Sequence, residues 1–232
     1  MDTTSYSPAE IKLAQSTFIS KVYSWMSLAL LITGAVAAYI ASSDALMESI
    51  VGNRGVFYGL LLGEIALVWV ISAAINRLSA TTATALFILY SVMNGLTLSV
   101  IFLRYTASSI GTTFFVTAGT FAVMSVYGHT TRRDLTSWGN LLLMALIGLI
   151  IASVVNLFWQ NSMFYWICTY VGILIFVGLT AYDTQKIKEY GAQGFSDSDS
   201  MQKNALIGAL QLYLDFINLF LYILRLLGNR RN

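Results

Sequence analysis

The stretch ALIGALQLYLDFINLFLYILRLLG, residues 205–228, decides the fold of this chain. At about 1.5 Å per residue in a helix, this apolar run is long enough to cross a hydrocarbon core of about 30 Å. Asp215 stands near its middle, where a carboxylate costs at least about 2.5–3.5 kcal/mol and needs a partner, water or a bound proton. A second acid, Asp183, ends the preceding apolar run in the string GLTAYDTQKIKEY.

The composition is that of a membrane protein. Of the 232 residues, 57% are hydrophobic and 10% are charged, and the mean hydropathy is +0.71. Soluble domains carry about 25% charged residues. The net charge of +2 is too small to indicate a nucleic-acid partner, and one Cys and one His give no metal-ligand spacing. We expect the lipid bilayer as the main partner, no cofactor and no structural metal.

Seven apolar runs predict an all-α membrane protein, a single bundle of seven transmembrane helices. A cytoplasmic polar tail (1–21) precedes this seven-helix domain (22–228), and a short basic tail (229–232) follows it. The connections are short except for residues 183–204, which we expect to form a flexible, exposed loop. The predicted spans are 22–41, 56–75, 81–103, 109–128, 139–159, 163–182 and 206–227.

Lysine and arginine are more frequent on the N-terminal side of the predicted spans than on the opposite side. This bias predicts a cytoplasmic N-terminus. The basic tail GNRRN, which a seven-span count places outside, weakens the bias. If the last run were re-entrant, the tail would lie inside and the bias would be stronger.

The second span combines a glycine stripe with an acid. Gly55, Gly59 and Gly63 repeat at four-residue spacing, which allows close helix packing; we favour packing within the bundle over a dimer seam. Glu64 follows at mid-depth of this span and is a candidate functional acid. A static ion pair with Arg225 or another interior arginine is an equal alternative.

Two carboxylates held close together in a low dielectric cannot both ionise cheaply, and they titrate as a unit. A shared proton would hold their helices together, whereas two charges would repel each other or recruit a cation. Calcium prefers oxygen ligands, so the pair predicts an element biased by pH and calcium. Because Asp183 lies near the end of its span and Asp215 lies mid-span, their contact requires a longer helix, a tilt or a break.

The strings LQLYLDFINLFLYILRLLG and AYDTQKIK, with YGHTTRRDLTSWGNLLLMALIGLIIASVVN, resemble the Bax inhibitor-1 family in its bacterial inner-membrane branch. The resemblance covers essentially the whole chain and implies a central last helix wrapped by the other six. Its characterised bacterial members are similar to pH-sensitive calcium leak channels. In them two aspartates, matching Asp183 and Asp215, share a proton and control closure.

The resemblance implies further site residues. It matches a glutamate of the second span to Glu64 and an arginine ten residues after the second aspartate to Arg225. The family also has an arginine late in the second span that latches onto the aspartates. In SAAINRLS the nearest counterpart is Arg77, slightly displaced. We therefore expect a pH-sensing group of Asp183, Asp215 and Arg77, and a cation path that includes Glu64 and Asp215.

Two other functions compete with a channel. A membrane aspartyl protease also uses a Tyr-Asp on one helix and an Asp on the next as general acid and base. Against it, YLDFIN lacks flanking glycines, and the single proline, Pro8, leaves no proline-containing docking string. The other alternative is a non-catalytic modulator of a membrane quality-control protease or another membrane complex. We expect a protein that is not an enzyme.

Overall fold

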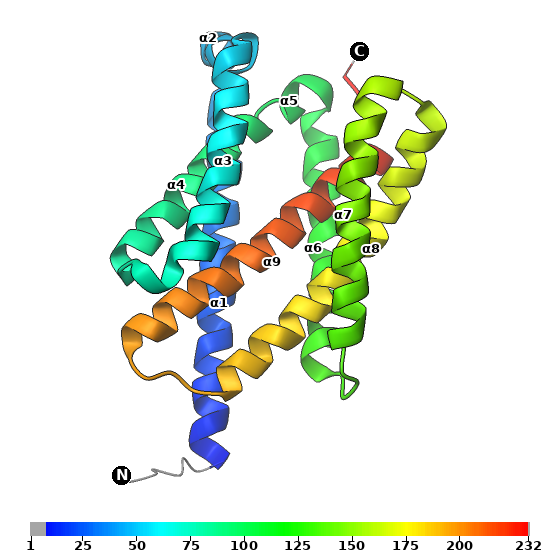
Figure 1. Ribbon diagram of the computed structural model, residues 1–232. Coiled ribbons are helices and arrows are strands. Elements are labelled where there is room, and N and C mark those ends of the chain that lie inside the picture. Colours follow the sequence, from blue (N-terminus) through cyan, green and yellow to red (C-terminus); the bar gives the residue numbers. More distant parts are fainter. Residues whose placement is uncertain (1–7, 232) are drawn as a thin grey trace. The chain divides into compact units, whose positions relative to one another are not determined.

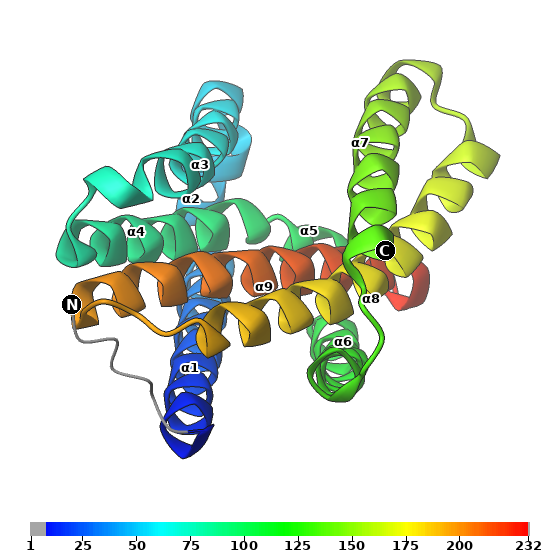
Figure 2. The ribbon, with the colours of Figure 1, turned by 60° about the horizontal axis from the view of Figure 1, so that its bottom comes forward.

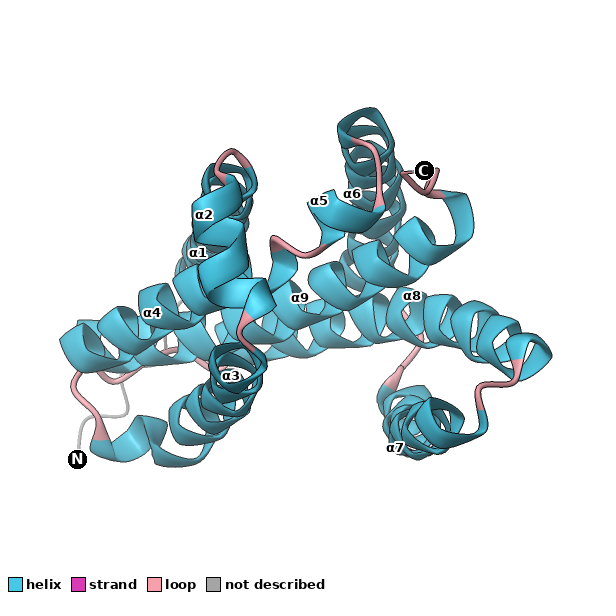
Figure 3. Cartoon of the chain, turned by 90° about the horizontal axis from the view of Figure 1, so that it is seen from above, coloured by secondary structure: helices cyan, strands magenta, loops and turns pink. Residues whose placement is uncertain are grey.

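The computed structural model describes residues 8–231, so part of the predicted polar tail, residues 1–7, and Asn232 lie outside the described residues (Figure 1). Helices and short connections form the described chain, together with one isolated bridge between Tyr105 and Arg230 (Figure 3). The helical elements are α1 (Pro8–Ala41), α2 (Asp44–Met47), the π turn η1 (Glu48–Gly52), α3 (Arg54–Ala74), the 3-10 turn η2 (Ile75–Arg77), α4 (Ala80–Leu98), α5 (Ile101–Arg104), α6 (Ala107–Thr130), α7 (Thr136–Trp159), α8 (Ser162–Ala192) and α9 (Ser198–Leu227).

Seven of these helical stretches in the described residues are long and apolar enough to cross a membrane, which confirms the predicted all-α class with seven spans. Their burial differs widely. The apolar window of α9 is 67% buried, whereas no other span exceeds 39%, so the last helix is the most enclosed, as expected. The window of α7 is only 6% buried, and Phe158 near its end is 86% exposed. Such an apolar surface belongs against lipid.

The expected long loop over residues 183–204 is wrong. Helix α8 continues to Ala192 and α9 begins at Ser198, so the connection between them is short. Although most residues after Asp183 are polar, some of them are buried. Thr184 is 3% exposed and Ile187 is 2% exposed. Because one face of this segment packs on protein, it stays helical. Helix α1 is longer than its predicted span as well, since it begins at Pro8.

The connection between α8 and α9 is built from local turn chemistry. Gly194 has a φ of +75°, in the left-handed region that glycine adopts without steric cost. Asp197 then accepts a hydrogen bond from the backbone N–H of Ser200, 2.6 Å away, in the manner of a helix N-cap. This hydrogen bond to the ionised form lowers the pKa of the Asp197 carboxyl.

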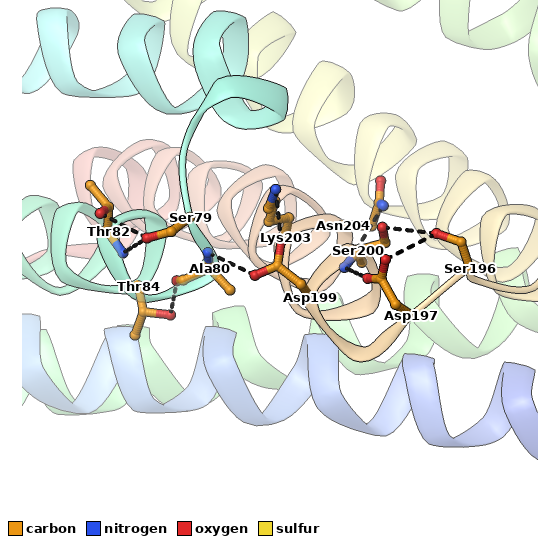
Figure 4. A network of polar contacts seen from close by, with 10 residues as sticks. All are labelled: Ser79, Ala80, Thr82, Thr84, Ser196, Asp197, Asp199, Ser200, Lys203 and Asn204. Atoms are coloured by element: carbon orange, nitrogen blue, oxygen red, sulfur yellow. Dashed lines mark hydrogen bonds and ion pairs between the residues drawn. The ribbon is translucent and has the colours of Figure 1, made fainter.

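The start of α9 also contacts the start of α4 (Figure 4). Asp199 accepts a hydrogen bond from the backbone N–H of Ala80 at 3.1 Å and pairs with Lys203 at 2.8 Å. Ser79 caps the same helix by accepting from the backbone N–H of Thr82 at 3.1 Å. The first turn of α4 is therefore satisfied partly by its own residues and partly by α9.

The chain divides into two compact units. The long helices α8 and α9, seen in Figure 2, contribute residues to both units. The first unit holds the described residues through Arg104 together with Lys188–Tyr213. In it α4 packs against α1 and α3. Thr33 on α1 is a polar hub: its hydroxyl donates to the carbonyl of Ser91 at 2.8 Å and shares a 2.7 Å hydrogen bond with the Tyr213 hydroxyl on α9.

The second unit begins at Tyr105, continues to Ile187 and resumes at Leu214. Its core combines side chains of α7, α8 and α9, including Leu149, Phe176 and Leu219. Glycines permit the closest helix approaches. A Cβ on Gly128 of α6 would overlap the backbone carbonyl of Ala181, and a Cβ on Gly139 of α7 would overlap the ring of Tyr182. Helix α8 is therefore held tightly from two sides just before Asp183.

Candidate functional site

The structure brings Asp183 of α8 and Asp215 of α9 together within the second unit. Their side chains are hydrogen-bonded to each other. Asp215 is only 4% exposed, and its Oδ2 is buried without any donor among the described residues. A carboxylate oxygen only accepts, so a hydrogen bond between two carboxyl groups requires one of them to carry a proton.

The residues that follow the two aspartates along their helices differ in character, aromatic on α9 and charged on α8. Phe216, one residue after Asp215, packs against Phe114 and Phe121 of α6 with ring centroids 5.5 Å away in both cases. The ammonium of Lys186, one turn after Asp183, acts electrostatically on the Asp183 carboxyl. Burial of this kind strengthens every charge interaction at the pair.

Helix α8 is fixed around Asp183 by neighbouring polar contacts. The hydroxyl of Thr184 donates to the hydroxyl of Ser125 on α6 at 3.5 Å. Gln185, 8% exposed, accepts from the backbone N–H of Leu135 at 2.8 Å and donates to the carbonyl of Arg133 at 2.9 Å. The connection between α6 and α7 is thus pinned to the helix that carries Asp183. The sequence analysis did not identify Gln185, because its structural role depends on backbone groups about 50 residues away in the sequence.

Glu64 of α3 lies in the interior of the first unit. It is 9% exposed and accepts a hydrogen bond from the hydroxyl of Thr97 at 2.7 Å and a longer one from the amide of Asn94 at 3.4 Å. The Oδ1 of Asn94 is buried without a partner among the described residues. Helix α4 therefore supplies the polar neighbours that make a buried carboxylate tolerable.

Arg225 lies in the second unit and is partly buried. Its guanidinium stands over two aromatic rings, 4.9 Å from the centroid of Tyr222 and 5.7 Å from that of Tyr165. Both distances are within the range of cation–π attraction, about 6 Å. An ion pair between Arg225 and Glu64 stays a prediction, because the two residues belong to different units.

Arg77 ends the 3-10 turn that follows α3, and its side chain is exposed. It belongs to the first unit, whereas Asp183 belongs to the second. Its expected role as a latch on the aspartates therefore stays a prediction.

The glycine stripe of α3 packs closely at one end. A Cβ on Gly63 would come within 2.7 Å of the methyl carbon of Met93 on α4. Gly59, in contrast, has no foreign atom within 4 Å of such a Cβ. Gly95 of α4 packs against backbone as well, because a Cβ there would come within 2.8 Å of the carbonyl oxygen of Thr33. The four-residue spacing did not indicate this contact.

These features define a membrane-embedded helical protein whose second unit contains a carboxyl pair, one member buried and the other partly buried. The sequence profile described as "Inhibitor of apoptosis-promoting Bax1" matches residues 15–232. The chain therefore belongs to the Bax inhibitor-1 family.

Relatives match it over nearly their whole length. The "Inner membrane protein YbhL" of Escherichia coli strain K12 is 53% identical over 216 residues, which cover 93% of this chain and 92% of the relative. An uncharacterised protein of Borreliella burgdorferi is 48% identical over 95% of each chain. An uncharacterised protein of Deinococcus radiodurans is 40% identical over 93% of this chain and 91% of its own length.

Proposed function

We propose that this protein is a pH-regulated cation leak channel of the bacterial inner membrane, with calcium as the permeant ion and the Asp183–Asp215 pair as its proton-controlled gate. The observation that carries the proposal is the hydrogen bond between the buried carboxyl of Asp215 and the partly buried carboxyl of Asp183 on a different helix. The inner-membrane location follows the name of the Escherichia coli relative. The cytoplasmic N-terminus follows the distribution of lysine and arginine.

The pair supplies the chemistry that such a gate needs. With one proton shared, the hydrogen bond ties α8 to α9 and the pathway is closed. When the proton leaves, two carboxylates face each other, and the carboxylate of Asp215 is only 4% exposed. They then separate or share a cation, and calcium accepts carboxylate oxygens readily. Proton loss therefore opens the gate, and flux rises with pH.

Glu64 contributes a second negative group to the proposed path. It is enclosed by protein and held by Thr97 and Asn94, so its carboxylate has a defined position. In this proposal Glu64 attracts the cation and the aspartate pair controls its passage. Arg77 is proposed to stabilise the closed state by pairing with a carboxylate of the gate.

The test is calcium flux into liposomes that contain only the purified protein and an internal calcium indicator. The expected result is an influx above that of empty liposomes, increasing from acidic to alkaline pH. Protein that is folded by thermal unfolding and inserted, yet passes no calcium or other cation at any pH, would overturn the channel. A modulator of a partner complex would then be the better explanation.

A further inference from the structure

A cavity of about 530 Å³ lies within the second unit between α6, α7 and α8. Its volume is in the range of ligand sites, about 300–1,000 Å³. Most of its wall is apolar, and several wall residues are exposed on the outer surface: Leu174 is 70% exposed and Trp138 is 63% exposed. These residues belong to membrane-spanning helices, so the cavity opens where lipid surrounds the protein.

The length of the cavity matches one lipid chain in one leaflet. Its wall extends along α8 from Tyr182 to Val171. At about 1.5 Å per residue this stretch is about 16 Å long. Half of a hydrocarbon core of about 30 Å is about 15 Å. An acyl chain that enters at the membrane surface would therefore reach the bilayer midplane along this groove.

The polar end of the cavity carries one positive and one negative group. Arg133 and Asp134 both line it, and both are exposed residues of the connection between α6 and α7. They form no ion pair in the part of the chain that the structure describes. Asp134 accepts a hydrogen bond from the backbone N–H of Thr136 at 2.8 Å, which lowers the pKa of its carboxyl and keeps it ionised. A fixed carboxylate beside an arginine is unfavourable for a purely anionic ligand.

Hydrogen bonds from α8 hold this polar end of the cavity in place. Buried Gln185 bonds to the backbone at Arg133 and Leu135, so the two charged residues are attached to α8 at the mouth of the groove. A binding element that is already ordered loses less entropy when a ligand arrives.

We propose that this groove binds a phosphatidylethanolamine-type phospholipid: an acyl chain lies between α6, α7 and α8, the phosphate binds Arg133, and the ammonium binds Asp134. Arginine is the side chain best suited to phosphate. The primary ammonium has three N–H donors for the carboxylate, whereas a quaternary choline has none and a glycerol headgroup has no positive charge. The charge pattern of Arg133 and Asp134 therefore favours ethanolamine over both.

The site adjoins the gate region but does not depend on it. Ala181 and Tyr182 belong to the wall of the groove, and Asp183 is the next residue along α8. A bound lipid would support the side of α8 that precedes the aspartate. Binding is measured without any flux, so the lipid site and the proposed channel can fail separately.

The experiment is native mass spectrometry of the full-length protein in mild detergent after equilibration with equal amounts of palmitoyl-oleoyl phosphatidylethanolamine, phosphatidylglycerol and phosphatidylcholine. Wild-type protein is expected to retain phosphatidylethanolamine in preference to the other two. Arg133→Gln should lower retention of all three by about fivefold, as expected for one basic residue at a membrane surface. Arg132→Gln is the matched control, since Arg132 is exposed in the same connection but does not line the groove.

Asp134→Asn tests the headgroup. Asparagine can still accept from the N–H of Thr136, so the start of α7 is kept while the charge is lost. The variant should retain total lipid but lose the preference for ethanolamine. Water-soluble glycerophosphoethanolamine, which lacks acyl chains, should not displace the lipid. The proposal is overturned if wild-type protein shows no ethanolamine preference, or if Arg133→Gln binds lipid as Arg132→Gln does.

Discussion

The carboxyl of Asp183 is hydrogen-bonded to the carboxyl of Asp215, although the two residues belong to different helices and lie at different distances from the ends of their apolar runs. Extension of α8 to Ala192 allows this contact, because Asp183 is then an interior residue of its helix. A hydrogen bond of this kind exists only while a proton is shared. In the proposed gate, the contact between α8 and α9 is therefore an element with two states.

Asp215→Asn should remove the pH dependence of calcium flux and hold flux at the low level of the closed state. The amide donates permanently to Asp183, so it imitates the proton-sharing pair at every pH. Flux into proteoliposomes between acidic and alkaline pH measures the effect. Asp197→Asn, in the exposed connection before α9, is the control and should keep the wild-type profile. A wild-type pH profile in Asp215→Asn would remove the pair from the role of sensor.

Glu64→Gln should lower calcium flux severalfold and leave the pH midpoint nearly unchanged. Glutamine has the same size and can still accept from Thr97 and Asn94, so the change removes charge and little packing. Flux against calcium concentration at fixed pH is the measurement. Glu48→Gln changes an exposed acid of the same unit and should have no effect. Equal flux in wild type and Glu64→Gln would place Glu64 outside the path.

Gly128→Ala should destabilise the protein by about 1–3 kcal/mol, because the added methyl overlaps the carbonyl of Ala181 in a packed interior. Thermal unfolding in detergent should show a lower Tm. Gly119→Ala on the same helix is the matched control, since its methyl would meet no foreign atom within 4 Å. Alanine is the better helix former, so the control should be neutral or slightly stabilising. Equal Tm values for the two variants would contradict the close contact of α6 and α8.

Periodicity and hydropathy were sufficient for the class of fold, because a chain in lipid must satisfy its backbone internally and long apolar runs become helices. Periodicity and hydropathy gave a wrong prediction at the end of α8, where they indicated a loop. Thr184, Gln185 and the residues after them are polar enough to indicate a loop, but buried contacts keep this segment helical. Tertiary packing overrode the local pattern there.

The candidate site was only partly visible in the sequence. Asp183, Asp215 and Glu64 could be singled out because an acid in an apolar run is costly. Gln185 and Gly128 could not, since the first depends on backbone groups of a distant connection and the second on a neighbouring carbonyl. Contacts with distant backbone groups of this kind produce no periodic pattern in the sequence.

Asp197→Ala should increase fraying of the first turn of α9 at neutral pH. The carboxylate accepts from the N–H of Ser200, and this hydrogen bond lowers the pKa of Asp197 in the folded protein. Its stabilisation is therefore present above the unfolded pKa and is lost as pH falls through the folded pKa. Hydrogen exchange of amides 199–202, corrected for intrinsic rates, should show protection falling at acidic pH in the wild type. Asp197→Asn should keep the protection and lose its pH dependence.

Arg77→Ala should open the pathway at a lower pH than in the wild type, if the proposed latch pairs this guanidinium with a carboxylate of the gate. Its position after α3 favours the alternative role, a positive-inside anchor, and the long stem of this exposed side chain reaches either inward or to the headgroups. A double-mutant cycle separates the two roles. With a latch, Arg77→Ala and Asp183→Asn break the same contact and show a coupling of about 0.5–3 kcal/mol in the opening equilibrium. Arg54→Ala, at the opposite end of α3, is the control and should be additive with Asp183→Asn. A coupling of zero for Arg77 as well would leave it as an anchor.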